Sequence, residues 1–290
     1  MLHPHREESA YSSGAAAARA PQSSMLDIDF AQVSDTGRSR DHNEDYVGCV
    51  TPDSDARVRS HGWLFSLADG VGGHDCGEVA SREAVETMLT GFRKAPGGEP
   101  LSGLLTRLVQ AANIRVYEAG RAASPGGTSM ATTIVACAIR FDRAVIAHVG
   151  DSRCYLIRRG HAKQLTRDHT VVNDQLRLGI LSAREAADHQ NKHLLSRSVG
   201  ADLFVNVDVT DTQILPGDAL LLCCDGFHGA VPEAQIGNIV NNMEDAKAAA
   251  HKLVQLANEL DGSDNISVQL VRIRNVERMG MYRGRPYKLR

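Results

Sequence analysis

The sequence lacks several features that would place the protein in a special class. It contains no run of the roughly 18 to 20 apolar residues that a membrane-spanning helix needs, and its N-terminus has no apolar core of a secretory signal. Its six cysteines include no Cys-x-x-Cys pair, so neither a zinc site nor a disulfide framework is indicated. The formal net charge of -3 does not suggest a nucleic acid or an anionic membrane as partner. We expect a globular protein without a membrane span, by default in the cytoplasm.

The length and composition are those of a protein with one large domain or two small ones. The chain has 290 residues, of which 42% are hydrophobic and 23% charged. Residues 1–24 are rich in Ala, Arg and Ser, and we predict a disordered leader because Glu7 and Glu8 argue against a transit peptide. The predicted catalytic domain spans residues 25–275. Residues 276–290 form a basic C-terminal tail that we interpret as solvated, with a docking peptide as the alternative.

Hydrophobic periodicity divides the domain into strands and paired helices. Short gaps between the strands of residues 130–160 favour antiparallel hairpins, while residues 163–195 form a loose segment with a short helix opened by a Ser182 to Glu185 capping box. Strands are predicted at residues 26–35, 45–50, 62–69, 130–139, 143–150, 152–160, 203–209, 218–225 and 266–273. Helices are predicted at residues 76–93 and 102–119, from Pro232 onward, and at residues 245–260.

This order of elements predicts an α+β fold. It suits a four-layer α-β-β-α sandwich, in which two mainly antiparallel sheets pack face to face and a helix pair covers each outer side. A doubly wound parallel sheet is the less favoured alternative, because the helices come in segregated pairs instead of alternating with strands.

Acidic residues recur where buried strands begin or end. The run "LLCCDG" ends on Asp225 and Gly226, and four other strand ends carry Asp45, Asp69, Asp151 and Asp264. A single Asp-Gly pair is an ordinary turn. Five carboxylates brought together would repel one another, and hard divalent cations such as Mg²⁺ or Mn²⁺ would relieve that repulsion. Two such ions can activate one water for attack on phosphorus.

Two arginines and two glycines fit the same chemistry. Arg38 and Arg40 precede the acid pair at positions 44 and 45. A guanidinium grips two phosphate oxygens, although an arginine in a polar loop is more often a solvated charge. The glycines after Asp69 and Asp225 would let the backbone come close to an ion.

At these residues the sequence resembles the metal-dependent protein phosphatases of type 2C (the PPM family), in particular the bacterial members, which remove phosphate from Ser and Thr. The matches occur in the order of the family and cover about residues 26 to 273. The matching stretches are "SDTGRSRDHNED" at 34–45, "LADGVGG" at 67–73, "GGTS" at 126–129, "HVGDSRCYLI" at 148–157, "LTRDHT" at 165–170, "LLCCDG" at 221–226 and "DNIS" at 264–267.

The resemblance implies a β-sandwich with a binuclear Mn/Mg centre at one end and a water bridging the two ions as the nucleophile. Asp69 should bridge both ions with Gly70 offering its carbonyl oxygen, Asp225 and Asp264 should bind the first ion, and Asp45 the second. Asp151 corresponds to the acid that, with Asp225, holds a third, weaker ion in bacterial members. Arg40 should bind the substrate phosphate, so Arg40, Asp69 and Asp225 are the predicted catalytic residues. Residues 163–195 match the variable flap that influences substrate choice; we call them the flap segment.

One position departs from the animal pattern. Animal members carry a histidine after the Asp-Gly of the second motif, often proposed as the general acid, whereas this chain has Val71. The proton donor is therefore open: a metal-bound water could serve, and His42, His74 and His169 are candidates by sequence proximity alone.

Two rival interpretations remain open from the sequence. The Cys-x5-Arg pattern of cysteine phosphatases occurs at residues 76–82 and 137–143, but it falls on a predicted helix and a predicted strand. A non-catalytic phosphoprotein-binding module on the same fold would be expected to lack metal acids, and here all five are present. The resemblance further implies phosphoprotein substrates, an opposing bacterial Ser/Thr kinase and a monomer.

Overall fold

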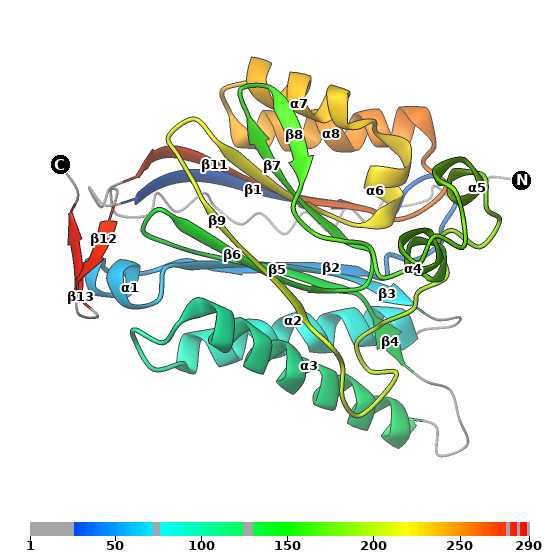
Figure 1. Ribbon diagram of the computed structural model, residues 1–290, viewed down its shortest axis with the longest axis horizontal. Helices are drawn as coiled ribbons and strands as arrows, with labels where there is room; N and C mark the ends of the chain where they lie inside the picture. Colours follow the sequence, from blue (N-terminus) through cyan, green and yellow to red (C-terminus); the bar gives the residue numbers. More distant parts are fainter. Residues whose placement is uncertain (1–25, 72–75, 124–129, 277–278, 283–284, 289–290) are drawn as a thin grey trace, which may run out of the picture.

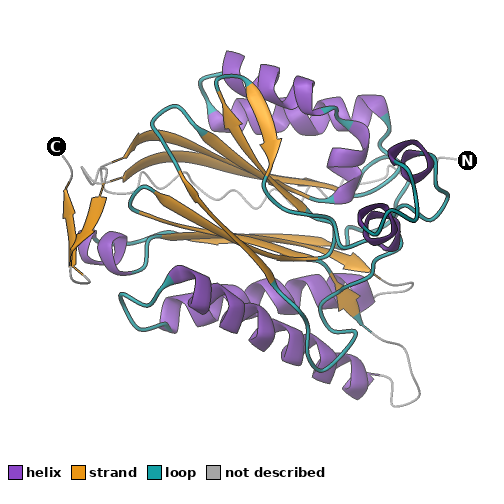
Figure 2. Ribbon diagram, in the orientation of Figure 1, coloured by secondary structure: helices purple, strands orange, loops and turns teal. Residues whose placement is uncertain are grey.

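Two antiparallel β-sheets packed face to face form the centre of the molecule, and helices cover the outer face of each sheet (Figures 1 and 2). The computed structural model describes residues 26–71, 76–123, 130–276, 279–282 and 285–288. The predicted α+β class and four-layer sandwich are confirmed. The doubly wound alternative is wrong, because every strand pair in these ranges is antiparallel. The predicted leader lies outside the described residues.

Each sheet is assembled from strands that are distant in the chain. One sheet has the order β2 (Asp45–Val50), β3 (Trp63–Val71), β5 (Ile134–Arg140), β6 (Arg143–Val149) and β9 (Asp208–Gln213), with β4 (Ala131–Thr132) paired to the end of β3. The other has the order β1 (Leu26–Asp35), β11 (Ile266–Val276), β10 (Ala219–Cys223), β7 (Arg153–Arg158) and β8 (His161–Gln164). The strands β8 and β9 are therefore edge strands.

Long helices pack in pairs on the outer faces, as predicted. The pair α2 (Cys76–Lys94) and α3 (Leu101–Ala123) covers the sheet of β3, and the pair α7 (Glu233–Asn242) and α8 (Ala246–Leu260) covers the sheet of β11 (Figure 1). The short helices are α1 (Asp55–Ser60), α4 (Val171–Arg177), α5 (Ala183–Ala187) and α6 (Asp225–Ala230). Of these only α5 was predicted, from its capping box, which is present. Part of the predicted basic tail forms a hairpin of β12 (Met279–Tyr282) and β13 (Arg285–Lys288).

The central strands are apolar on both faces because both faces are buried. On β3, Phe65 and Leu67 point into the core between the two sheets, while Leu64 and Ala68 point toward α2 and α3. All four side chains are fully buried. The sequence of a strand that has helices on one side and a second sheet on the other is an unbroken apolar run, because neither face of the strand is exposed to water.

The connection from β6 to β7 differs from the prediction. The short gap favoured a hairpin, yet β6 pairs with β5 and β9, whereas β7 pairs with β10 and β8 in the other sheet. The chain crosses between the sheets at Gly150, whose φ of 103° is open to glycine but strained for other residues. The crossing places Asp151 between the two sheets at one end of the sandwich. Two strands also differ in extent, since β9 begins later than residue 203 and β11 continues to Val276.

A glycine contact between α7 and the β7–β8 hairpin generates a testable prediction. A Cβ at Gly237 would lie 2.1 Å from the carbonyl oxygen of Gly160. We expect Gly237→Ala to lower the free energy of unfolding by about 1–3 kcal/mol, the usual cost of overpacking. Gly103→Ala is the control, because a Cβ there meets nothing within 4 Å and should stabilise α3 by up to about 1 kcal/mol. Urea denaturation of both variants measures the difference, and equal stabilities would contradict it.

Candidate active site

The five acids predicted from the sequence lie at one end of the sandwich. In an antiparallel sheet the end of one strand lies beside the start of its partner. The strands β2 and β11 begin at this end, and β3, β6 and β10 finish there. The acids at these strand ends are Asp45, Asp69, Asp151, Asp225 and Asp264.

Asp45 and Asp69 form the most buried part of the cluster. They are paired residues on the neighbouring strands β2 and β3. Asp45 is only 7% exposed, and neither of its carboxylate oxygens has a hydrogen-bond partner among the described residues. The backbone around Asp69 is well bonded: its N–H donates to Thr133 Oγ1 (3.0 Å) and its carbonyl accepts from Thr132 Oγ1 (2.7 Å). A buried carboxylate without a donor is costly unless a cation compensates it.

The pKa values show how strongly these carboxylates oppose one another. Burial raises the pKa of Asp45 to about 7, and the charges of Asp225 and Asp264 add to the effect. The nearby Ser267 hydroxyl and Cys224 thiol offset part of the rise, although neither meets the geometry of a hydrogen bond to the carboxylate. Burial, followed by the charges of Asp45, Asp225 and Asp151, raises the pKa of Asp69 well above its usual value. Burial and Asp225 raise the pKa of Asp151 to about 7. Without a cation, the cluster would hold protons near neutral pH.

Close backbone approaches bring the remaining acids to the cluster. A Cβ at Gly226 would lie 2.2 Å from the carbonyl oxygen of Asn265 and 3.1 Å from the Cβ of Asp264, so the start of α6 can pack against the start of β11 only with glycine. This contact sets Asp225 beside Asp264. Gly70 is equally constrained, since a Cβ there would lie 2.3 Å from the carbonyl oxygen of Gly77 at the start of α2.

The loop that carries Arg40 is held by one side chain from the other end of the chain. Asn265 donates from Nδ2 to the carbonyls of Thr36 and His42 (both 2.9 Å) and accepts from the N–H of Glu44 (2.8 Å). Arg40 donates from Nη2 to Asp264 Oδ2 at 2.9 Å, and its side chain stays 51% exposed. Asn265 lies in the matching stretch "DNIS", but no role was predicted for it; the structure identifies it as the residue that positions the loop.

The donor set fits hard divalent cations. The ligand atoms of Asp45 and Asp69 lie within 4.8 Å of one another and of Cys224 Sγ, and those of Asp151, Asp225 and His193 form a second such group. Burial, followed by the negative charge of Asp45, raises the pKa of Cys224 well above its usual value, so this thiol stays protonated. Carboxylate oxygens therefore dominate the first group, which suits Mn²⁺ or Mg²⁺ better than Zn²⁺.

The rival cysteine mechanism finds no support in the structure. The stretch from Cys76 to Arg82 lies in helix α2 instead of a phosphate-binding loop. Cys137 is fully buried within β5 and cannot meet a substrate.

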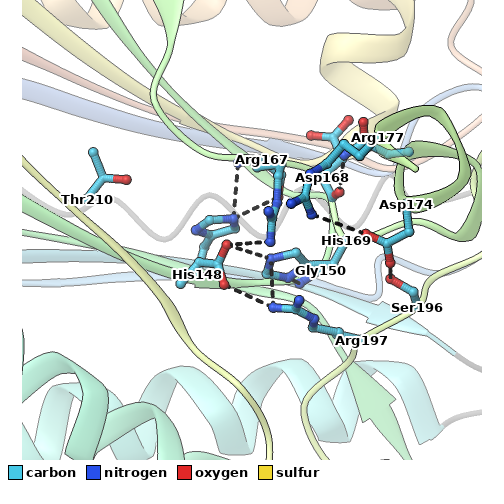
Figure 3. A network of polar contacts seen from close by, with 12 residues as sticks. His148, Gly150, Arg167, Asp168, His169, Asp174, Arg177, Ser196, Arg197 and Thr210 are labelled. Carbon is cyan, nitrogen blue, oxygen red and sulfur yellow. Dashed lines mark hydrogen bonds and ion pairs between the residues drawn. The ribbon is translucent and has the colours of Figure 1, made fainter. Parts of the chain in front are cut away.

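A polar network fastens both ends of the flap segment to the sandwich (Figure 3). The entry and exit segments of the flap are bonded to each other, since the N–H of Val171 donates to the carbonyl of Leu194 at 2.9 Å. At the entry, Arg153 of β7 binds Asp168 through two nitrogens (2.6 and 2.9 Å). Asp208 of β9 accepts from Arg167 at the entry (2.8 Å) and from Arg197 just past the exit (2.9 Å). Two carboxylates thus hold the flap on the scaffold.

The histidines are placed differently from what sequence proximity suggested. His169 is fully buried, stacks on His148 with ring centroids 4.7 Å apart, and accepts from the N–H of Gly150. Burial, with the neighbouring His148, lowers the pKa of His169 to about 4, so His169 is neutral at pH 7. It belongs to the polar network that holds the flap segment on the sandwich. His42 is exposed on the loop of Arg40, and His74 lies outside the described residues.

A histidine of the flap that contacts the acids was missed. His193 of the flap places Nδ1 3.5 Å from Asp225 Oδ2, and this contact raises the pKa of His193. The two residues are 32 positions apart, so no local pattern predicts their contact, and the high histidine content of the flap segment is the one indication of it in the sequence. The same contact and His228 hold the pKa of Asp225 below its usual value, although burial opposes this.

Comparison with known proteins identifies the class. The family model of protein phosphatase 2C matches residues 31–266. The chain is 36% identical to the serine/threonine phosphatase stp of Listeria innocua over 256 residues, which cover 87% of this chain and 96% of that protein.

Two solved structures are also similar. The serine/threonine phosphatase of S. agalactiae has a TM-score of 0.78 and 30% identity, covering 85% of this chain and all of that one. The catalytic domain of the serine/threonine phosphatase PstP, solved in complex with two manganese ions, has a TM-score of 0.72 and 32% identity, covering 86% of this chain and 99% of that one.

The chain belongs to the protein phosphatase 2C family. It is a protein serine/threonine phosphatase of this metal-dependent, bacterial type, and phosphoproteins are its substrates. Within the part of the chain that the structure describes, none of the helices combines the length and apolar character that a bilayer crossing demands.

The crowded carboxylates predict how the stability of the metal-free protein depends on pH. Asp45 and Asp151 have native pKa values of about 7 against 3.8 for an ordinary Asp. The native state therefore keeps protons that the unfolded state has lost, and this contribution to stability disappears as the pH rises through 7. In EDTA we expect the free energy of unfolding to fall by about 1 kcal/mol between pH 7 and 8.5.

Above pH 7 the buried histidines add little to the trend, because His169 and His228 have native pKa values of about 4 and an ordinary value of 6.5, so both are mostly neutral in the native and in the unfolded state. Urea denaturation at each pH measures the trend. Asp45→Asn should reduce the fall in the free energy of unfolding with pH, and so should saturating Mn²⁺. A rise in stability with pH in EDTA would contradict the prediction.

Proposed function

We propose that this phosphatase hydrolyses phosphoserine and phosphothreonine by direct attack of water at a centre of two Mn²⁺ or Mg²⁺ ions. Asp45, Asp69, Asp225 and Asp264 would hold these ions, with the carbonyl of Gly70. When bound, the ions would supply Lewis acidity, which lowers the pKa of water and neutralises phosphate charge. The observation that carries the proposal is the carboxylate of Asp45, which is buried beside Asp69 with both oxygens unpartnered.

Each acid has a position that suits its proposed part. Asp69 lies in the middle of the cluster, since the charges of Asp45, Asp225 and Asp151 all act on its pKa, and a central carboxylate suits a bridging ligand. Asp151 and Asp225 lie on the side of the flap, where with His193 their ligand atoms fall within 4.8 Å. This second group would hold the third, weaker ion. The two-manganese complex of PstP, a relative, supports the count of two for the main centre.

Arg40 is the proposed phosphate ligand. Its Nη2 is bound to Asp264 while half of its side chain is exposed. The bond to Asp264 aims the guanidinium at the centre, and the other nitrogens remain available for phosphate oxygens. A role in binding follows, because Arg40 contacts the acidic cluster only at its exposed rim.

The non-catalytic module is not favoured. A binding module has no use for a buried carboxylate pair, which costs stability without a cation. The described residues keep all five acids and Arg40.

The cellular setting remains a prediction. We propose that the enzyme opposes a bacterial Ser/Thr kinase. A monomer suffices for catalysis, because all the proposed ligands come from one chain. A cytoplasmic location stays an expectation from the sequence.

Metal removal tests the mechanism. EDTA should abolish hydrolysis of p-nitrophenyl phosphate, and Mn²⁺ should restore it. Asp69→Asn and Asp225→Asn should lower kcat by on the order of 100-fold or more, the scale for loss of one group that stabilises the transition state. Asp211→Asn, an exposed acid on β9, and Cys76→Ser are controls that should stay active. Full activity in EDTA, with loss in Cys76→Ser, would reverse the assignment.

Substitution of Arg40 separates binding from chemistry. We expect Arg40→Ala to raise KM for a phosphothreonine peptide by about tenfold with a smaller change in kcat, since a charge-assisted hydrogen bond contributes about 1.5 kcal/mol or more. Arg40→Lys should recover only part of the loss, because an ammonium lacks the fork geometry. Steady-state kinetics gives both constants, and an unchanged KM would remove Arg40 from phosphate binding.

A further inference from the structure

A cavity of about 470 Å³ opens beside the β7–β8 hairpin, away from the acidic cluster. Its lining joins residues of the β7–β8 hairpin to Thr212 of β9, and β8 and β9 are edge strands of the two sheets. The rest of its lining comes from residues 156–165 and contains leucines, basic side chains and one histidine. These residues are Leu156, Arg158, Arg159, His161, Lys163 and Leu165.

The cavity carries an unbalanced positive charge. None of its lining residues is acidic. Arg158 is neutralised by Asp218, which it binds through two nitrogens at 2.7 and 2.8 Å. Arg159 and Lys163 have no ion pair within the described ranges of the chain, and both are exposed. Two free cations thus stand at the rim, in a protein whose formal net charge is -3.

Arg159 occupies a backbone conformation that disfavours its side chain. Its φ is 53° and that of Gly160 is 76°. Such a two-residue turn prefers Asn-Gly, because both positions have positive φ. The turn is also clamped, since the carbonyl of Gly160 lies against Gly237 of α7. An arginine kept at a strained, rigid position suggests a use for the guanidinium.

The strand β7 links the cavity to the proposed phosphate site. It begins just after Asp151, and Lys163 lies opposite Leu156. At about 3.3 Å per residue, Leu156 is about 17 Å and Arg158 about 23 Å along the strand from Asp151. An extended peptide would need about five to seven residues to cover this distance.

We propose that Arg159 and Lys163, with the cavity between them and β9, dock an acidic segment of the phosphoprotein substrate, about five to seven residues from the phosphorylated Ser or Thr. This inference rests on the proposed function of the acidic cluster. The apolar walls from Leu156 and Leu165 and the small number of free cations favour a peptide over a nucleic acid, which needs a longer basic surface.

Peptide substrates with and without an acidic block test the proposal. One set carries three glutamates five to seven residues before the phosphothreonine, another carries them after it, and matched peptides carry glutamines. For one of the two placements we expect KM to be about threefold to tenfold lower with glutamates, the range for two exposed ion pairs. The advantage should shrink at 0.5 M NaCl, because salt screens exposed charges.

Variants of the two cations locate the effect. Arg159→Asn with Lys163→Gln should remove the KM advantage of the glutamate peptides while leaving kcat and the hydrolysis of p-nitrophenyl phosphate unchanged. Asn suits the turn better than Arg, so Arg159→Asn should keep or raise the Tm, which separates a docking role from a structural one. Lys252→Gln, on an exposed position of α8, is the matched control and should keep the advantage.

A binding measurement independent of catalysis distinguishes the two proposals. Titration of the isotope-labelled enzyme with an unphosphorylated glutamate peptide should shift the backbone amide NMR signals of residues 158–165, and the double variant should lose these shifts. Absence of both the shifts and the KM advantage would overturn docking even if p-nitrophenyl phosphate is hydrolysed. Absence of metal-dependent hydrolysis would overturn the proposed function, while the NMR result would still decide docking. A KM advantage of the glutamate peptides that persists in the double variant would also overturn the docking proposal.

Discussion

Repulsion among buried carboxylates is the constraint on which the rest of the active end depends. The sheets deliver Asp45 and Asp69 to the same register position, with Asp225 and Asp151 close enough to raise the pKa of Asp69. A folded chain tolerates such an arrangement only if cations or protons neutralise it. The same property that destabilises the metal-free protein therefore suits the site to hard divalent cations.

The surrounding backbone is shaped to maintain this crowding. Gly70 and Gly226 allow contacts that any Cβ would prevent, and each follows a cluster acid directly. Asn265 ties the loop of Arg40 to the start of β11 through three hydrogen bonds, so this loop is held beside an acid about 220 residues away in the chain. Rigid support of this kind keeps ligands in place before an ion binds, which reduces the ordering cost of binding.

The two proposals place substrate selection on a different part of the scaffold from the chemistry. In the proposed mechanism the acidic cluster and Arg40 bind only the phosphate, and the cluster lies at the strand ends, away from most of a bound peptide. The flap segment is anchored to β7 and β9 by Asp168 and Asp208, and β7 continues away from the cluster into the β7–β8 hairpin. A substrate that lies along this flank would meet the flap and the basic cavity in succession. Specificity can then vary through edge residues without disturbing the metal site.

The sequence by itself determined the sandwich and the identity of the acids, because both depend on local patterns. Runs that are apolar on both faces, such as β3, predicted buried strands, and the acids at their ends predicted the site that the fold brings together. The crossing of the chain at Gly150, the place of His193 beside Asp225 and the burial of His169 were decided by the tertiary structure alone. The physical reason is that a short gap between strands is compatible with either sheet. Likewise, a histidine in a polar loop acquires its environment only from residues far away in the chain.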